Sequence, residues 1–180
     1  ILFNRSVNNI KAKNIFSNVK TDIIPGSSKG LKVINLTVEE KPTGEISLGA
    51  GFGTSGGTIG GGIKENNFLG KGIKLNSNLQ VSDKSIKGQF IYEKPNFNYS
   101  DNSLFTSIRS TTTDNEKDFG YKTSDLGFSV GTSFEQFENL YFIPEVDVSL
   151  ERLETTSTAS ASLKKQKGDY FDTYFNYSLI

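Results

Sequence analysis

Apolar and polar residues alternate along most of the chain after residue 43, and this period of two predicts β-strands with one apolar and one polar face. The pattern is clearest where Ile46, Leu48, Ala50 and Phe52 alternate with Ser47, Gly49, Gly51 and Gly53. The alternation is least regular in the fourth and fifth strands, and no helix is predicted in this region. We expect eight strands, near residues 46–53, 58–64, 73–82, 86–94, 104–111, 125–134, 146–151 and 170–179.

The connections between these strands alternate in character. Short polar turns are expected at residues 54–57 and 82–85, and long polar loops at 112–123 and 154–168. Aromatic side chains concentrated at every second connection are typical of the interfacial girdle of a transmembrane β-barrel. These girdle residues are Phe68, Phe97, Tyr99, Phe137, Tyr141 and Phe142. The pattern predicts antiparallel up-and-down barrel strands, and a soluble β-sandwich, whose strands alternate in the same way, is the alternative.

Residues 1–43 follow a different pattern. Val7, Ile10, Ile15 and Val19 form an approximate helical stripe, with a turn expected at residues 14–18. Two strands are expected near residues 19–24 and 31–39, joined by a turn that contains Pro and Gly. The segment Pro42-Thr43-Gly44 is a natural boundary between this region and the next. We therefore expect a small α+β domain at 1–43 and a β domain at 44–180, both belonging to a longer protein.

The composition excludes several kinds of chemistry. The 180 residues include no His, Cys, Met or Trp, so a Ser-His-Asp triad, a thiol nucleophile and a Cys/His zinc site cannot form within this chain. Lys and Arg total 20, as do Asp and Glu, and this neutral balance argues against a nucleic-acid partner. Residues 51–56 match G-x-G-x-x-G, but no helix is expected after them, so we predict no dinucleotide site. We expect no enzymatic activity, no cofactor and no metal site.

Glycine is concentrated in one part of the chain, because 11 of the 18 glycines lie between Gly44 and Gly72. Glycine lets a barrel wall bend and lets backbones approach closely, which is the purely structural interpretation. Glycine also weakens a strand, and a weakly paired edge leaves N–H and C=O groups that can template another strand. In this second interpretation a gate strand pairs with substrate. The gate strand comprises Ile46, Ser47, Leu48, Gly49, Ala50, Gly51, Phe52 and Gly53.

The stretch from Val38 to Thr54 resembles the junction between the last POTRA domain and the first barrel strand in the BamA family of outer-membrane β-barrel assembly factors. Residues 65–72 and 93–97 look like the first two periplasmic turns of that family, and residues 14–19 resemble the end of its last POTRA helix. The resemblance implies a barrel of sixteen strands. This chain would hold about eight of them, preceded by a partial POTRA domain.

The same resemblance implies a function. The protein would be a membrane insertase of the bacterial outer membrane, which folds β-barrel proteins by strand templating at a lateral gate. Its expected partners are unfolded outer-membrane β-barrel proteins, the lipid bilayer and accessory lipoproteins, with the N-terminal module in the periplasm. The alternative is a small closed barrel of eight strands with a structural or passive role, since eight is the smallest common size.

Overall fold

The structure is a computed structural model that describes residues 2–53 and 56–180. The chain divides into two compact units, Ile1–Thr43 and Gly44–Ile180. The division falls at the Pro- and Gly-containing segment that separates the two sequence patterns. The turn expected at residues 54–57 lies partly outside the described residues.

The N-terminal unit consists of one helix and one β-hairpin. Helix α1 spans Leu2–Ala12, and the antiparallel strands β1 (Phe16–Pro25) and β2 (Lys32–Glu40) follow it. The predicted helix and strands are confirmed, but Ile15 and Val19 do not continue the helix. Asn14 adopts a left-handed conformation (φ 56°) that ends it. A POTRA module is not evident in the described helix and hairpin.

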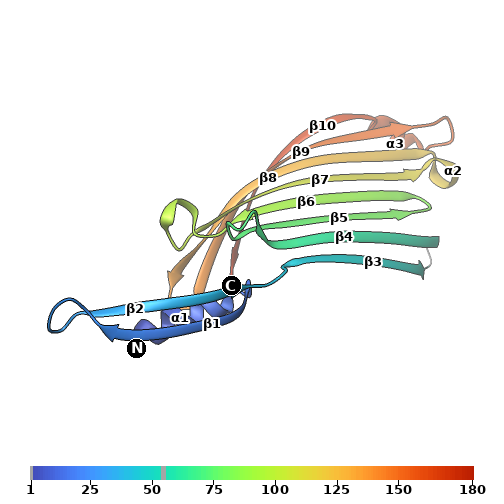
Figure 1. Cartoon of the computed structure of the whole chain (residues 1–180). Coiled ribbons are helices and arrows are strands. Elements are labelled where there is room, and N and C mark those ends of the chain that lie inside the picture. The colour runs from blue at the N-terminus through green and yellow to red at the C-terminus, as the bar shows by residue number, and fades with distance from the viewer. Residues whose placement is uncertain (1, 54–55) are drawn as a thin grey trace. The chain divides into compact units, whose positions relative to one another are not determined.

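The second unit is a single antiparallel sheet of eight strands, which lie in the order of the chain (Figure 1). All eight strands predicted from the alternation are confirmed. Within the described residues the first and last strands are not paired with each other, so the sheet is open and the closed eight-stranded barrel does not hold for this structure. The strands are β3 (Gly44–Gly53), β4 (Gly56–Phe68), β5 (Ile73–Ser82), β6 (Ser85–Lys94), β7 (Ser103–Asn115), β8 (Tyr121–Phe137), β9 (Leu140–Thr155) and β10 (Gly168–Leu179).

The prediction of a long polar loop at residues 112–123 is wrong. β7 continues to Asn115 and β8 begins at Tyr121, so only residues 116–120 connect them. The facing ends of these strands carry Thr, Ser, Asp and Lys on both faces, which resembles a loop in sequence. Their backbones are nevertheless paired as far as Asn115 and Tyr121.

Short helices lie in the connections, where none was predicted. Helices α2 (Glu116–Phe119) and α3 (Ala161–Lys165) follow β7 and β9, and a 3-10 turn η1 (Phe97–Tyr99) follows β6. Gly120 closes α2 with φ 70°, where a side chain would also collide with the backbone at Ala159. No helix in the described part of the chain is long and apolar enough to cross a bilayer.

At β8 and β9 the sheet exposes apolar side chains and buries several polar ones. On β8, Leu126 and Phe128 are 52% and 47% exposed, whereas Ser129 on the opposite face is 1% exposed. Asp147 and Ser149 of β9 are each 5% exposed and share the face of Ser129. We call these two sides the apolar face and the polar face. A soluble β-sandwich would bury the apolar face against a second sheet, and the described residues of this unit form one sheet.

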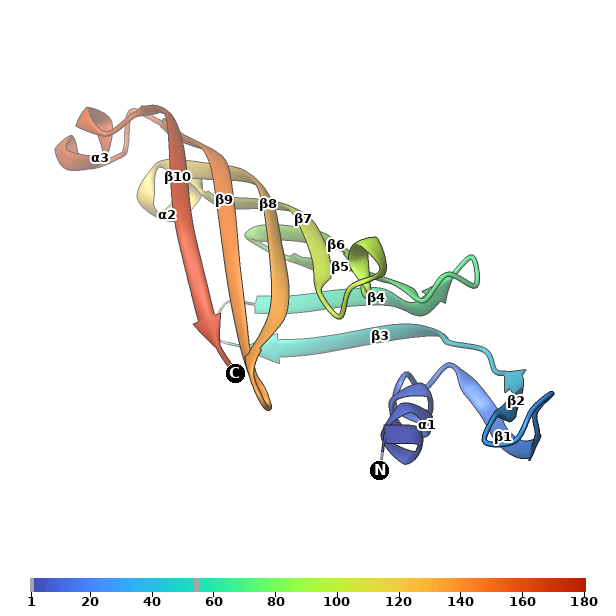
Figure 2. The same ribbon diagram turned by 90° about the vertical axis from the view of Figure 1, so that its left-hand side faces the viewer.

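The sheet is strongly twisted and curved, so that β8–β10 run across the direction of β3 and β4 (Figure 2). Only Ile73, Leu153 and Ala159 are buried apolar residues among those described. The unit therefore lacks a conventional apolar core. Its strands are held by backbone pairing and by side-chain contacts on the polar face, an arrangement suited to surroundings that solvate apolar side chains.

Candidate functional site

Among the strands that the structure describes, β3 has a partner on one side only. All ten of its residues pair with β4, from Gly44 opposite Glu65 to Gly53 opposite Gly56. In an antiparallel sheet, successive residues direct their N–H and C=O groups alternately toward one neighbour and the other. About half of the backbone groups of β3 therefore lie along an edge that no described strand covers. The eight residues predicted as the gate strand all lie within β3.

The side chains of this edge strand are the most exposed apolar ones in the sheet. Ile46, Leu48 and Phe52 are 79%, 87% and 95% exposed. They lie on the apolar face with Ala50, because each is two residues from the next. A strand entering beside β3 would cover these side chains as well as the free backbone groups.

Cross-strand packing between β3 and β4 is sparse. Seven of their ten residue pairs contain at least one glycine, and the three that do not are Glu45 with Lys64, Ile46 with Ile63 and Ala50 with Ile59. Between β8 and β9, only two of fourteen pairs contain glycine. Contacts between opposed side chains stabilise a sheet, so β3 is held less firmly than the strands at the other side.

The glycines of β3 and β4 differ in the space around them. A Cβ atom placed on Gly60 would lie 3.3 Å from the Leu79 carbonyl oxygen, and one on Gly62 would lie 3.2 Å from the Ser77 oxygen. These β4 glycines allow close backbone approach. A Cβ placed on Gly49, Gly51 or Gly53 of β3 would meet nothing within 4 Å.

The two interpretations of the glycine-rich region therefore apply to different strands. Close approach explains the glycines of β4, as the structural interpretation predicts. It does not explain Gly49, Gly51 and Gly53 of β3, where the described chain leaves room for an added Cβ atom. The space beside Gly49 and Gly51 belongs to a glycine-lined hollow of about 560 Å³ that extends over Gly60 and Gly62 on the polar face.

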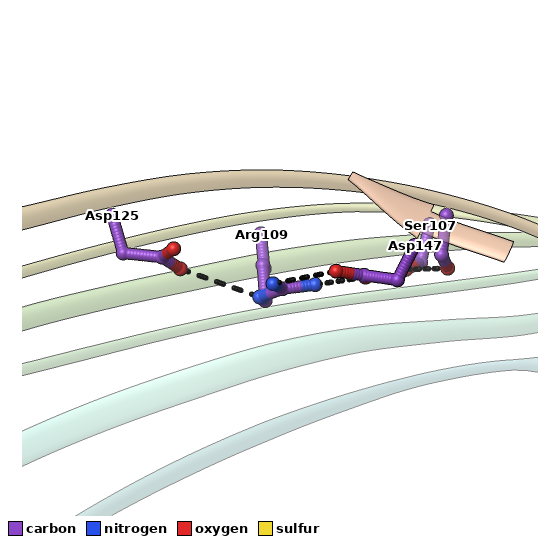
Figure 3. A network of polar contacts seen from close by, with 5 residues as sticks. Ser107, Arg109, Asp125 and Asp147 are labelled. Carbon is purple, nitrogen blue, oxygen red and sulfur yellow. Dashed lines mark hydrogen bonds and ion pairs between the residues drawn. The ribbon is translucent and has the colours of Figure 1, made fainter. Parts of the chain in front are cut away.

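Strands β7, β8 and β9 are joined by a polar network at the other side of the sheet (Figure 3). Arg109 of β7 forms a bidentate ion pair with Asp147 of β9, in which Nη2 donates to Oδ1 at 2.9 Å. Arg109 Nε also donates to Asp125 of β8 at 3.3 Å. Ser107 and Ser129 share a further hydrogen bond at 2.7 Å. These contacts connect three consecutive strands through side chains.

Gly127 makes the reach of Arg109 possible. Gly127 lies directly opposite Arg109, on the strand between Arg109 and Asp147. A Cβ on Gly127 would lie 2.6 Å from Arg109 Nη2, so the guanidinium group lies flat over the glycine. No sequence pattern indicated this network, because β7 has an irregular pattern and Asp147 lies 38 residues from Arg109.

The predicted girdle residues lie at one end of the sheet. Phe68 ends β4, Phe137 ends β8, and Phe97 and Tyr99 lie in η1 after β6. Because successive connections lie at alternate ends of an up-and-down sheet, these positions share the end at which β3 begins. Tyr99 and Phe137 project strongly, with exposed fractions of 104% and 66%.

The two remaining girdle residues lie on opposite faces of β9. Phe142 is opposite Phe134 on the apolar face, while its neighbour Tyr141 is opposite Glu135 on the other face. Phe142 packs edge-on against Phe134, with ring centres 5.6 Å apart, and lies 6.3 Å from the ring of Tyr177. Phe134 and Tyr177 thus form an aromatic cluster with Phe142. Neither residue was predicted as part of the girdle, because that prediction considered only the connections between strands.

The opposite end of the sheet carries exposed charge. Lys84, between β5 and β6, forms an ion pair with Asp118 of α2. The hydrogen bond to this carboxylate, followed by its charge, raises the pKa of Lys84 above its ordinary value. The described residues contain no group of three carboxylates placed to hold a metal ion. The features gathered at β3 are a backbone edge, an exposed apolar surface and a glycine-lined hollow.

Comparison with known proteins supports the barrel architecture. The crystal structure of BamA from Haemophilus ducreyi lacking POTRA domains 1–3 matches 98% of this chain with a TM-score of 0.75 and 21% sequence identity. The match covers 36% of that protein, so this chain spans about a third of its length. No family model matches the sequence. The likeness is one of fold, and it identifies the open eight-stranded sheet as similar to part of the BamA barrel.

Proposed function

We propose that this chain belongs to an outer-membrane assembly factor that folds and inserts β-barrel proteins, and that β3 is the strand with which substrate pairs. The observation that carries the proposal is glycine in seven of the ten pairs that join β3 to β4, which leaves β3 weakly held on that side. The fold of the BamA barrel supports the placement of the sheet in the outer membrane. The apolar face would contact lipid, and the polar face would line the interior.

The mechanism needs no covalent chemistry. An unpaired N–H or C=O group within a bilayer costs several kcal/mol, so a substrate strand cannot enter lipid with bare edges. The edge of β3 would satisfy those groups while the rest of the substrate folds. Main-chain pairing depends little on side chains, so substrates of different sequence could use the same edge. This action requires neither enzymatic activity nor a cofactor.

The remaining assignments follow from the same proposal. The helix and hairpin of residues 2–43 would be the end of a POTRA domain in the periplasm. Further strands of the longer protein would cover the edge of β10 and complete a barrel of about sixteen strands. Unfolded outer-membrane proteins, the bilayer and accessory lipoproteins would be the partners. The girdle residues Phe68, Phe97, Tyr99, Phe137, Tyr141 and Phe142 would mark the periplasmic interface, with Tyr141 directed away from lipid.

Site-specific crosslinking tests the gate. In the full-length protein, Ser47→Cys or Gly49→Cys on β3 should form disulfides with cysteines in the terminal strand of an arriving barrel protein. Asn78→Cys is a matched control, because Asn78 is exposed on the same face of the sheet as Ser47. Both residues pair with Gly62 of β4, one from each side, so they lie at the same height along the strands. Since Asn78 belongs to β5, which has partners on both sides, its thiol should not crosslink. A functional protein that gives no crosslinks along β3 would contradict the proposal.

A further inference from the structure

Bulky side chains in this sheet repeatedly lie over a glycine on the neighbouring strand. Phe105 of β7 is directly opposite Gly131 of β8, and a Cβ there would lie 2.8 Å from Phe105 Cε2. Arg109 lies over Gly127 in the same way. Both pairs are on the polar face, where the glycine leaves space for a planar group to lie flat on the backbone. Covering of a strand glycine by an aromatic ring stabilises cross-strand pairing.

The same arrangement recurs on the apolar face between β3 and β4. Phe52 is opposite Gly57, and its Cε1 atom would lie 3.3 Å from a Cβ on that glycine. Leu48 is opposite Gly61, where the corresponding distance to Cδ2 is 2.9 Å. Gly57, Gly61, Gly127 and Gly131 are thus each covered by a Phe, Leu or Arg side chain directly opposite.

Three strand glycines have no such cover. Gly49, Gly51 and Gly53 are the strand glycines, among those described, at which an added Cβ would meet no atom within 4 Å. All three lie on the polar face of β3. They alternate along β3, whose second side no described strand covers. The hollow beside Gly49 and Gly51 continues over the glycines of β4, so it extends across more than one strand.

We infer that Gly49 and Gly51 form a socket for a bulky planar side chain of the arriving strand, directed toward the polar face. This inference rests on the proposed pairing function of β3 and adds a side-chain preference to it. The ring or guanidinium group would lie over Gly51 as Phe105 lies over Gly131 and Arg109 over Gly127. Substrate strands would then be selected by one inward-facing residue in addition to backbone pairing.

Small side chains would leave the hollow open. A strand with alanine or serine opposite Gly51 could still form its backbone hydrogen bonds with β3. It would lack the side-chain contact that is present at Gly57, Gly61, Gly127 and Gly131. Favourable cross-strand pairs shift pairing equilibria by about two- to fivefold, which sets the expected size of the preference.

A peptide crosslinking experiment on the full-length protein in detergent tests this inference. The probes are two synthetic ten-residue strands of alternating polar and apolar residues, identical except for Phe or Ala at one central polar-face position. Each carries a cysteine four residues away, so that a disulfide to the thiol introduced by Ser47→Cys places the variable residue opposite Gly51. The Phe peptide should crosslink about two- to fivefold faster than the Ala peptide.

Two variants make the result specific. Gly51→Val fills the socket and should reduce the ratio of the two crosslinking rates to about one. The space around Gly51 accepts the new side chain, and heat-dependent electrophoretic mobility would verify that the barrel is folded. Gly88→Ala is the matched control. Its methyl group would meet Leu79 Cδ1 at an ordinary 3.8 Å, away from β3, and the ratio should be unchanged.

The outcomes separate the socket from the gate. Equal rates for both peptides, or a preference that survives Gly51→Val, would overturn the socket and leave edge pairing intact. Failure of both peptides to crosslink would overturn the pairing role of β3 and the socket with it. A preference for Phe that Gly51→Val abolishes and Gly88→Ala preserves supports both.

Discussion

Gly127 and Gly49 are both strand glycines on the polar face, yet their surroundings are opposite. Gly127 lies beneath the guanidinium group that connects β7, β8 and β9. Gly49 faces open space at the edge of the sheet. The same amino acid therefore permits a tight side-chain bridge at one position and leaves a surface uncovered at the other. An identical substitution at the two sites should have different effects.

We expect Gly127→Ala to destabilise the protein by about 1–3 kcal/mol, because the methyl group overlaps with Arg109 and forces it off Asp147. Gly49→Ala should be neutral, or stabilising by about 0.4–1 kcal/mol, since alanine restricts the unfolded chain and meets no atom in the folded one. Urea unfolding of the full-length protein in detergent, followed by tryptic protection and electrophoretic mobility, would measure both. Equal losses of stability for Gly127→Ala and Gly49→Ala would contradict the difference in surroundings between the two glycines.

Whole strands also differ in how firmly they are paired, and β3 is paired less firmly than β8. The pairs that join β3 to β4 mostly contain glycine, whereas β8 has the side-chain contacts of Arg109 and Phe105. Local openings begin where few side-chain contacts support the backbone hydrogen bonds. The sheet should therefore separate first at β3, while β7–β9 behave as one body.

Hydrogen exchange should resolve this order. Amides of β3 in the full-length protein should exchange about tenfold or more faster than those of β8, which corresponds to an opening free energy lower by about 1.4 kcal/mol. Mass spectrometry of peptides covering Gly44–Gly53 and Tyr121–Phe137, in detergent micelles, would measure the two rates. Equal protection of both strands would show that the glycine pairs do not weaken the edge.

The sequence predicted the strands well because the signal for a strand is local. Alternation within ten residues was enough to locate β3, and it placed Ile46 and Phe52 on one face. Register is not local. That Arg109 lies over Gly127 and reaches Asp147 depends on two strand pairings, which no pattern within β7 specifies.

The polar strand ends show a second limit of the sequence. Residues 112–115 and 121–125 carry polar side chains on both faces, and the loop prediction relied on that polarity. They are extended because the pairing of β7 with β8 continues beyond the apolar band. The two roles of glycine likewise could not be separated until the register showed which glycines face a bulky residue.

At the level of the whole molecule, the exposed apolar face determines the environment in which the sheet is stable. Burying one Leu, Ile or Phe side chain is worth about 1.5–3 kcal/mol. Ile46, Leu48 and Phe52 of β3 alone therefore represent about 5–9 kcal/mol if they leave water. This is comparable to the entire stability of a typical domain. The other strands expose further side chains of the same kind.

We therefore expect the full-length protein to remain folded and monodisperse in detergent or lipid, and to aggregate when the detergent is removed. Size-exclusion chromatography with light scattering, before and after detergent removal, would measure this. Transfer into bilayer nanodiscs should restore a single species, because acyl chains replace the detergent on the apolar face. A monodisperse protein in plain buffer would mean that another surface covers that face. The apolar side of β3 could then not be the side that meets lipid and substrate.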